Sequence, residues 1–170
     1  MIPRFTVWCL LSLLLGLAGC AQYRLGTGAQ PGFATLYIEP VRNQTLLPQA
    51  QAIVSTQLRE AFIHDGRVTL VNSEAEADAT LTVVLHDYHR VVTAVREDDT
   101  GLARKFALTL ATECTLHDNR GGRDLFKNRP VSVNRDAFTD GGQLQSEYQT
   151  LPLLAEALGQ KISHSVLDVW

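Results

Sequence analysis

Alternating apolar and polar residues predict three long strands in the chain. Residues 33–41, 79–95 and 102–118 are rich in strand-forming side chains, and apolar residues recur in them at every second position. Because side chains alternate across a strand, one face of each segment is predicted to be buried and the other to face water. On the two longer segments the predicted buried residues are Ala79, Leu81, Val83, Leu85, Phe106, Leu108, Leu110, Cys114 and Leu116.

Apolar residues spaced three and four positions apart predict two helices. The first lies within residues 42–67, where Pro48 fits the first turn and Gly66 fits the left-handed position just past the end. The second is predicted over residues 151–170. Gly159 inside the second helix costs about 1 kcal/mol relative to alanine. Packing against the rest of the domain must therefore hold that turn.

Two weaker strand signals complete the order of elements. Residues 68–71 form a short strand after the first helix, and residues 123–138 form a last, polar strand that Pro130 interrupts or places at an edge. Turns are expected at residues 96–101 and 119–122. We predict an α+β fold, with two amphipathic helices packed on one face of a mostly antiparallel four- to five-stranded sheet. The other sheet face is then exposed or covered by a partner.

The start of the chain has the pattern of an export signal. Arg4 precedes an apolar run over residues 5–17, which is too short for a comfortable membrane span. The sequence LAGC at residues 17–20 then resembles the lipobox of bacterial lipoproteins, which implies that Cys20 carries lipid after cleavage. The alternative is an ordinary secretory signal in which Cys20 has no role.

These features divide the chain into three segments. Residues 1–19 are predicted to be a lipoprotein signal peptide, residues 20–32 a flexible tether rich in Gly, Ala and Gln, and residues 33–170 a single α+β domain. Cys9 lies in the signal and Cys114 on an apolar strand face, so the cysteines provide no disulfide framework. We interpret Cys114 as a small core residue.

The charge balance argues against a nucleic-acid partner. The chain has 15 Lys and Arg side chains, and removal of Arg4 with the signal leaves 14 of them against 18 Asp and Glu. Nucleic-acid binding requires clustered basic side chains that neutralise phosphates. A faintly acidic chain does not meet that requirement.

No group of residues in the sequence predicts an enzyme, a metal site or a cofactor. His86, Asp87 and His89 form a weak metal-binding pattern, but side chains three positions apart on a strand point to opposite faces. The acidic residues 97–99 are better explained as a solvated hairpin tip than as a calcium loop. The tripeptide GGQ at residues 141–143 also occurs in peptide-release factors, which act on the ribosome, and we attribute it to chance.

Basic residues around the two predicted turns are the remaining candidates for ligand binding. Such side chains can pair with the phosphates of a glycolipid through charge-assisted hydrogen bonds. They can also serve solubility and protect a sheet edge. The candidates are Arg96, Arg104, Lys105, Arg120 and Arg123.

Several segments together resemble the LPS-assembly lipoprotein (LptE) family, and in particular its LptE-related branch. They are CAQYRLG after the predicted cleavage site, IEPVRNQTLLPQ with its Asn43-Gln44-Thr45, and DGR followed by a strand and EADATL. With a final helix that ends in Trp170, the resemblance covers nearly all of residues 20–170. The family fold of two helices against a four-stranded sheet agrees with the predicted order of elements.

This resemblance implies a non-enzymatic lipoprotein of the outer membrane. In that family the protein sits as a plug inside the LptD β-barrel and helps to deliver lipopolysaccharide to the outer leaflet. Cys20 would bear the lipid, and Ala21 after it lacks the aspartate associated with retention in the inner membrane. Each buried methylene of the attached chains contributes about 0.8 kcal/mol, so three acyl chains give a stable anchor.

Two other functions stay open at this point. The strand-helix-strand unit with VRNQT and DGRVTLV also resembles the periplasmic α/β modules of curli-secretion and penicillin-binding-protein-activator lipoproteins, which bind a protein partner without touching glycolipid. A lipoprotein hydrolase has only isolated Ser and His residues in its favour. Retrieval of a β-barrel rather than a peptidoglycan synthase would separate the first two functions.

Overall fold

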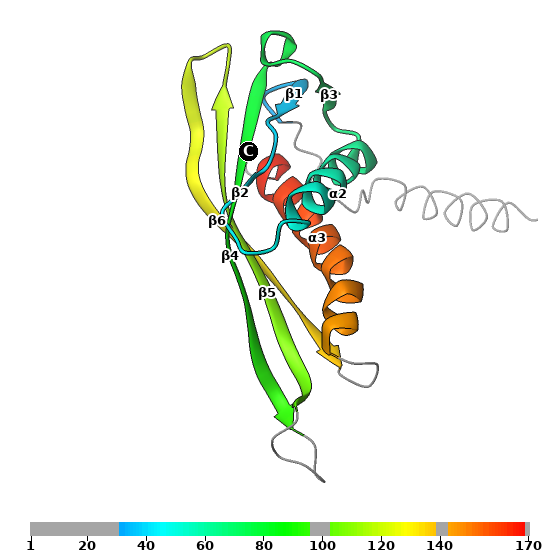
Figure 1. Ribbon diagram of the computed structural model, residues 1–170. Helices are drawn as coiled ribbons and strands as arrows, with labels where there is room; N and C mark the ends of the chain where they lie inside the picture. The colour runs from blue at the N-terminus through cyan, green and yellow to red at the C-terminus, as the bar shows by residue number, and fades with distance from the viewer. Residues whose placement is uncertain (1–30, 96–102, 139–142, 169–170) are drawn as a thin grey trace, which may run out of the picture.

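The computed structural model describes residues 31–95, 103–138 and 143–168 and shows two helices on the same side of a long sheet (Figure 1). This arrangement confirms the predicted α+β fold. The elements are β1 (Thr35–Ile38), β2 (Arg42–Asn43), α2 (Ala50–Asp65), β3 (Thr69–Val71), the 3-10 helix η2 (Glu74–Glu76), β4 (Ala79–Val95), β5 (Ala103–Asp118), β6 (Arg123–Phe138) and α3 (Gln143–Leu167).

The sheet is mixed and has six strands, slightly more than the predicted four to five. Its order is β3-β1-β4-β5-β6, and the short β2 lies beside β4. The three long strands are antiparallel, as predicted, whereas β1 is parallel to both β3 and β4, and β2 is parallel to β4. The parallel part arises because α2 returns the chain so that β3 runs in the same direction as β1.

A β-bulge in β4 changes which residues face the helices. Before it, Ala79, Leu81, Val83 and Leu85 are fully buried on the helix side, which confirms the predicted face. Leu85 pairs with Thr112 and Asp87 with Ala111, so His86 is the extra residue. Beyond the bulge, Tyr88 and Arg90 contact α3. The simple alternation rule that we applied to His86 and His89 therefore does not hold across this point.

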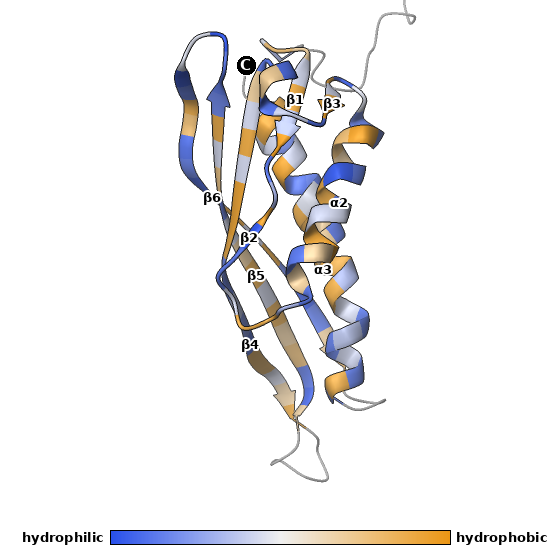
Figure 2. Ribbon diagram, turned by 45° about the horizontal axis from the view of Figure 1, so that its top comes forward, coloured by the Kyte–Doolittle hydropathy of each residue, from blue (hydrophilic) through white to orange (hydrophobic). Residues whose placement is uncertain are grey.

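The bulge also divides the molecule into two halves with different cores. We call residues 31–85, 110–131 and 155–168 the basal half; it contains β1, β2, β3, α2 and most of one large apolar cluster. Residues 86–95, 103–109, 132–138 and 143–154 form the distal half, where three strands meet only the first part of α3 (Figures 1 and 2). The smaller cluster of the distal half consists of Phe106, Leu108, Ala137 and Leu154.

The two helices pack closely because of a glycine. A Cβ atom added at Gly159 of α3 would lie 2.8 Å from the carbonyl oxygen of Gln57 in α2. The missing side chain therefore lets the two backbones approach, which explains why a residue that weakens a helix stands here. At the end of α2, Gly66 has φ 72° and its N–H donates to the carbonyl of Phe62 at 3.2 Å. This confirms the predicted left-handed position.

Helix α3 begins earlier than predicted. It starts at Gln143 and continues through Pro152, whereas the apolar stripe in the sequence begins only at Leu151. Pro152 cannot donate to the carbonyl of Tyr148, but Tyr148 is exposed and that carbonyl is on the solvent side of the helix. The preceding turns carry buried polar residues instead of an apolar stripe, and Thr150 donates to the carbonyl of Ser146 at 2.7 Å.

Strand β6 forms one edge of the sheet, which confirms the edge position predicted for Pro130. Pro130 lies opposite Glu113, where its missing N–H leaves the strand continuous. The register between β5 and β6 shifts next to Asn128, which has φ 50°. This irregular edge was not predicted, because single residues with positive φ other than glycine have little sequence signal.

Candidate functional site

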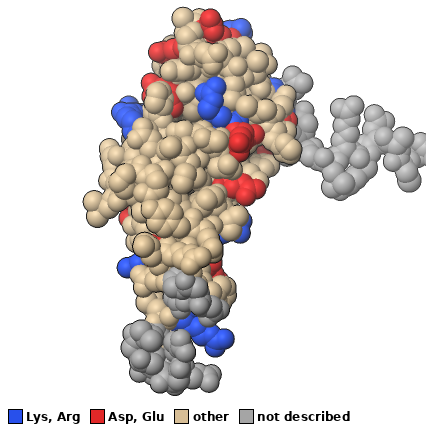
Figure 3. All heavy atoms as spheres, turned by 45° about the vertical axis from the view of Figure 1, so that its right-hand side comes forward, with Lys and Arg blue, Asp and Glu red and all other residues tan. Residues whose placement is uncertain are grey.

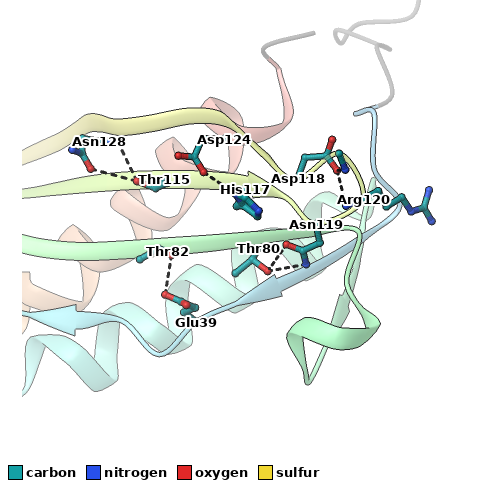
Figure 4. A network of polar contacts seen from close by, with 11 residues as sticks. Glu39, Thr80, Thr82, Thr115, His117, Asp118, Asn119, Arg120, Asp124 and Asn128 are labelled. Atoms are coloured by element: carbon teal, nitrogen blue, oxygen red, sulfur yellow. Dashed lines mark hydrogen bonds and ion pairs between the residues drawn. The ribbon is translucent and has the colours of Figure 1, made fainter.

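The turn between β5 and β6 is held by a network of polar contacts at the basal end of the sheet (Figure 4). Asn119 donates to Thr80 at 3.0 Å and to the carbonyl of Ala77 at 3.0 Å. Asp78 is 7% exposed, and its Oδ2 accepts the backbone N–H of Ala34 at 2.9 Å. That hydrogen bond lowers the pKa of Asp78 below its ordinary value. The network joins the start of β1 to the turn.

Polar pairs also cover the sheet face that points away from the helices. Thr82 donates to Glu39 at 2.8 Å, and the ring Nδ1 of His117 lies 2.8 Å from Asp124. Figure 4 shows these side chains turned toward one another. Each of these four side chains already has a hydrogen-bonding partner. The part of this face shown in Figure 4 is therefore a solvated polar surface rather than a cluster of converging reactive groups.

The structure places the predicted glycolipid-binding residues at opposite ends of the molecule. Arg104 and Lys105 lie at the distal start of β5, whereas Arg120 and Arg123 lie at the basal turn. At the usual rise of a strand the two pairs are roughly 40 Å apart. Arg120 forms an ion pair with Asp78 at 2.5 Å. Four residues predicted as one group therefore belong to two separate surfaces.

Two further predicted residues lie outside the described part of the chain. Cys20 precedes residue 31, and Arg96 falls between β4 and β5. The lipid attachment predicted for Cys20 and the phosphate contact predicted for Arg96 stay predictions.

The distal end carries apolar side chains on its surface. Val91 and Val92 of β4 are each 54% exposed, and Phe138 at the end of β6 is 56% exposed. Leu144 and Tyr148 on the first turns of α3 are more exposed still. Figure 3 shows a broad area with few charged groups in the middle of the molecule, and Lys and Arg groups at its lower, distal part. Apolar residues gathered at one end of a protein commonly mark a binding surface.

Basic side chains lie beside these apolar residues. The Nζ atom of Lys105 is 2.8 Å from Asp136 and 5.8 Å from the ring centroid of Phe138. Arg90 forms an ion pair with Glu147 of α3 and lies 6.0 Å from the ring of Phe106. The distal end thus combines apolar contact area with cationic groups, which suits an amphipathic anionic ligand.

A contact between β4 and α3 fixes the position of this surface. Tyr88 donates to Glu147 at 3.4 Å, next to the ion pair that Arg90 makes with the same carboxylate. Burial, together with the negative charge of Glu147, raises the pKa of Tyr88 to about 12. Tyr88 therefore stays neutral at physiological pH and acts as a hydrogen-bond donor.

The sequence analysis did not identify the exposed apolar residues of the distal end. We expected one buried face along the whole of residues 79–95, yet Val91, Val92 and Val95 are about half exposed. The adjacent Val91 and Val92 break the alternation of apolar and polar residues, and this break was the available signal. It marks the place where the strand is no longer covered on either side.

The remaining titratable groups with shifted pKa values lie in the basal half. Arg67 pairs with Asp65 and Asp168, each at 2.7 Å, and so ties the ends of α2 and α3 together. Its hydrogen bond to Asp65 lowers the pKa of that carboxyl. Burial raises the pKa of the Cys114 thiol to about 11. The Arg67 ion pairs connect the two helices, and Cys114 is part of the buried core.

Within the described residues there is no group of three or more His, Cys, Asp or Glu side chains that could hold a metal ion. The helices described there also include none that is long and apolar enough to cross a membrane.

Comparison with protein families decides what kind of protein has this fold. The LptE lipopolysaccharide-assembly family matches residues 33–164, which include α2, all six described strands and all but the last three residues of α3. The chain belongs to the LptE family. This confirms the resemblance seen in the sequence, and it makes the chain a lipopolysaccharide-assembly family protein. No curated protein sequence matches the chain.

Solved structures share the fold of this LptE-family chain at low sequence identity. A protein from Xanthomonas campestris has a TM-score of 0.59 at 13% identity, covering 86% of this chain and 91% of its own. A minor lipoprotein from Acinetobacter baumannii has a TM-score of 0.52 at 17% identity, with 78% and 91% covered. Lipoprotein B from Nitrosomonas europaea has a TM-score of 0.51 at 16% identity, with 85% and 86% covered. At these identities the likeness concerns the fold alone.

Proposed function

We propose that this LptE-family chain is a lipoprotein of the outer membrane, anchored through Cys20, that partners and plugs an LptD-type β-barrel during lipopolysaccharide assembly. The distal end contacts lipopolysaccharide in this proposal. The observation that carries the proposal is that Val91 and Phe138 are exposed on the sheet face away from α3, with Lys105 beside Phe138. Val92 is exposed on the opposite face. The acyl chains of a glycolipid would meet the apolar side chains, and its phosphates the cations.

The dimensions of the domain support this orientation. β1, which follows the predicted anchor segment, pairs with the first residues of β4 at the basal end. From there β4 extends over 17 residues, or roughly 55 Å, to the distal end. An anchor on the basal side and a glycolipid-binding surface on the distal side would let the domain reach from the membrane surface into the lumen of a barrel.

Arg104, Lys105 and Arg96 are the basic residues proposed to meet glycolipid phosphates. Arg104 and Lys105 lie at the distal end, and Arg96 follows β4 in the sequence. Arg120 and Arg123 lie at the basal turn, where Arg120 pairs with Asp78. The proposal does not need the basal pair, which makes it a suitable comparison.

Purification from outer membranes tests the partnership. Crosslinked wild-type protein should retrieve a large β-barrel, and Cys20→Ala should lose membrane attachment and most of the barrel. Retrieval of a peptidoglycan synthase instead would favour the protein-adaptor function. Retrieval of neither from wild-type membranes would contradict the proposed partnership.

Binding to purified lipopolysaccharide tests the ligand surface. The double variant Arg104→Ala/Lys105→Ala removes two distal cations, and Arg120→Ala/Arg123→Ala removes the same charge at the basal turn. A charged hydrogen bond contributes about 1.5–3 kcal/mol, so the distal variant should bind at least about tenfold more weakly. The basal variant should bind within about twofold of wild type. Equal losses in both variants would show a general charge effect and contradict a distal site.

A further inference from the structure

Among the described residues, no strand pairs with the outer edge of β4 beyond Leu85. β2 pairs with β4 only at Val84 and Leu85, and the last backbone contact on this side is the Gln44 N–H donating to the Leu85 carbonyl at 2.8 Å. From residue 86 onward, no strand among the described residues pairs with this edge, and only β5 pairs with the other (Figure 1). A free strand edge presents a row of unpaired N–H and C=O groups.

The middle of this edge is regular enough to accept another strand. Six consecutive pairs, from Asp87–Ala111 to Val92–Phe106, follow without a register shift, between one bulge at His86 and another near Ala94. Residues 87–92 contain no proline and no glycine, and Val91 and Val92 are each 54% exposed. β-branched side chains of this kind favour strand pairing.

The opposite edge of the sheet is protected in the way that natural proteins protect edges. β6 contains Pro130, the basic residues Lys127 and Arg129, and a register shift at Asn128. Each of these features hinders the addition of a further strand. Residues 87–92 of β4 have no proline and no register shift, and their basic residue Arg90 is held in an ion pair with Glu147 of α3. This part of the β4 edge therefore lacks two of the three protective features of β6.

A hydrogen-bonded loop places an apolar side chain near the start of the free edge. Oδ1 of Asn43 accepts the N–H of Thr45 at 2.9 Å, and Nδ2 of Asn43 donates to the carbonyl of Leu47 at 2.8 Å. These bonds explain the Asn43-Gln44-Thr45 motif noted in the sequence. Between them stands Leu46, which is 99% exposed and follows β2 by three residues. A leucine that is fully exposed in the unbound protein gains free energy when a partner buries it.

We propose that residues 87–92 of β4 accept an extended segment of the protein partner as an added strand, with Leu46 packing against the same partner. The proposal rests on the proposed function, in which the partner is a β-barrel. The strands of a closed barrel already have both edges paired. The added segment therefore comes from the partner's chain outside the barrel wall, in an extended conformation, and backbone hydrogen bonds bind it.

Proline substitutions test the backbone contact. Neighbouring N–H groups along a strand point to opposite edges, so of Val91→Pro and Val92→Pro one removes a donor to the free edge and the other a donor to β5. Thermal unfolding identifies the variant that keeps β4–β5 pairing, because that variant keeps the higher Tm. The proline variant with the higher Tm should retrieve at least about fivefold less of the β-barrel protein than wild type does. Retrieval at the wild-type level by this folded variant would overturn the proposal.

A photo-crosslinking residue tests the same contact without a change in the backbone. Placed at Val91 or at Leu46, it should form adducts with the barrel protein that map to a segment outside the barrel strands. Placed at Asn134, an exposed residue on the β6 edge, it is the matched control and should give at least about tenfold fewer adducts. Adducts mainly with a second copy of this chain, or equal adducts at Asn134, would overturn the proposal. If wild-type protein retrieves no barrel at all, the proposed function itself fails.

Discussion

The basal and distal halves use the same three long strands in different ways. In the basal half, α2 and α3 cover the sheet, and the helix-facing residues of β4 are fully buried. In the distal half only the first part of α3 covers the sheet, and the second half of β4 is largely exposed. The comparison separates two tasks: the basal half supplies most of the folding free energy, and the distal half presents surfaces.

This division fits a protein that must remain folded while one end works in contact with a ligand or partner. Apolar side chains that are left exposed contribute little to stability, but they contribute to binding once a partner covers them. The β4 edge and the surface around Phe138 both belong to the distal half. We therefore expect substitutions in the two halves to have different effects on stability and binding.

The largest difference should come from core truncations. Leu81→Ala or Leu110→Ala removes a fully buried side chain from the large cluster and should lower the free energy of unfolding by about 2–5 kcal/mol. Val91→Ala in the distal half removes a half-exposed side chain and should cost less than about 0.5 kcal/mol. Urea unfolding of the three variants measures these changes in the free energy of unfolding. Losses below about 0.5 kcal/mol for both leucines would contradict the strand faces described here.

The contact between the helices should be the next most sensitive feature. Gly159→Leu places a side chain where even a Cβ atom would lie 2.8 Å from the Gln57 carbonyl oxygen, so α2 and α3 must separate. We expect a loss of about 2 kcal/mol, and for a domain of this size that lowers Tm by about 4–8 °C. Gln160→Leu, at the exposed neighbouring position, is the control and should leave Tm within about 2 °C. Equal Tm values for both variants would show that Gly159 does not set the helix spacing.

The sequence predicted the basal half better than the distal half, for a physical reason. Alternation in residues 79–85 and the spacing of apolar residues in α2 follow directly from burial on one side, and both predictions were confirmed. The parallel pairing of β1 with β4 depends on contacts between distant segments, which no local pattern records. The bulge at His86 likewise leaves no distinct signal, although it changes the face of every residue after it.

The sequence could not predict where the candidate basic residues lie in the fold, and their binding of glycolipid phosphates stays a prediction. Basic residues near the turns were identified from the sequence, yet sequence distance could not show that Lys105 and Arg120 lie at opposite ends. Arg120 forms its ion pair with Asp78, which lies in a distant part of the sequence, so this pairing could not be predicted from the residues near Arg120. The Asn43-Gln44-Thr45 motif was noted as a family feature, and only the structure shows that it shapes the loop around Leu46.

A smaller effect should follow from removing the buried carboxylate of the basal turn. Asp78→Ala leaves the N–H groups of Ala34 and Thr35 without their acceptor, which should cost about 1–3 kcal/mol at pH 7. Asp136→Ala removes a half-exposed partner of Lys105 in the distal half and should cost less than about 1 kcal/mol. Thermal unfolding at pH 7 compares the stability of the two variants. A larger loss of stability for Asp136→Ala than for Asp78→Ala would contradict the larger structural role given to Asp78.

The same carboxylate makes the stability depend on pH in a defined direction. The pKa of Asp78 is lowered from 3.8 in the folded state, chiefly by the hydrogen bond from Ala34, so its ionised form stabilises the fold above that pH. The contribution is lost as the pH falls below about 4 toward the lowered pKa. The difference in Tm between wild type and Asp78→Ala should therefore shrink between pH 5 and pH 3. A difference that stays constant over this range would show that ionisation of Asp78 does not contribute.

The two halves can also be compared by the reaction rate of a single thiol placed in each, which perturbs the protein least. Cys114 is 1% exposed and burial raises its pKa to about 11, so at pH 8 it should react with a thiol reagent only when the basal half opens. In a Cys20→Ala chain without residues 1–19, Cys114 is the single thiol. Val91→Cys in a Cys114→Ala background places the thiol in the distal half at a half-exposed position. We expect Cys114 to react at least about 100-fold more slowly than Cys at position 91, and equally fast in denaturant. Comparable rates in the folded protein would mean that the basal half opens as readily as the distal half, and the proposed division of tasks would then be wrong.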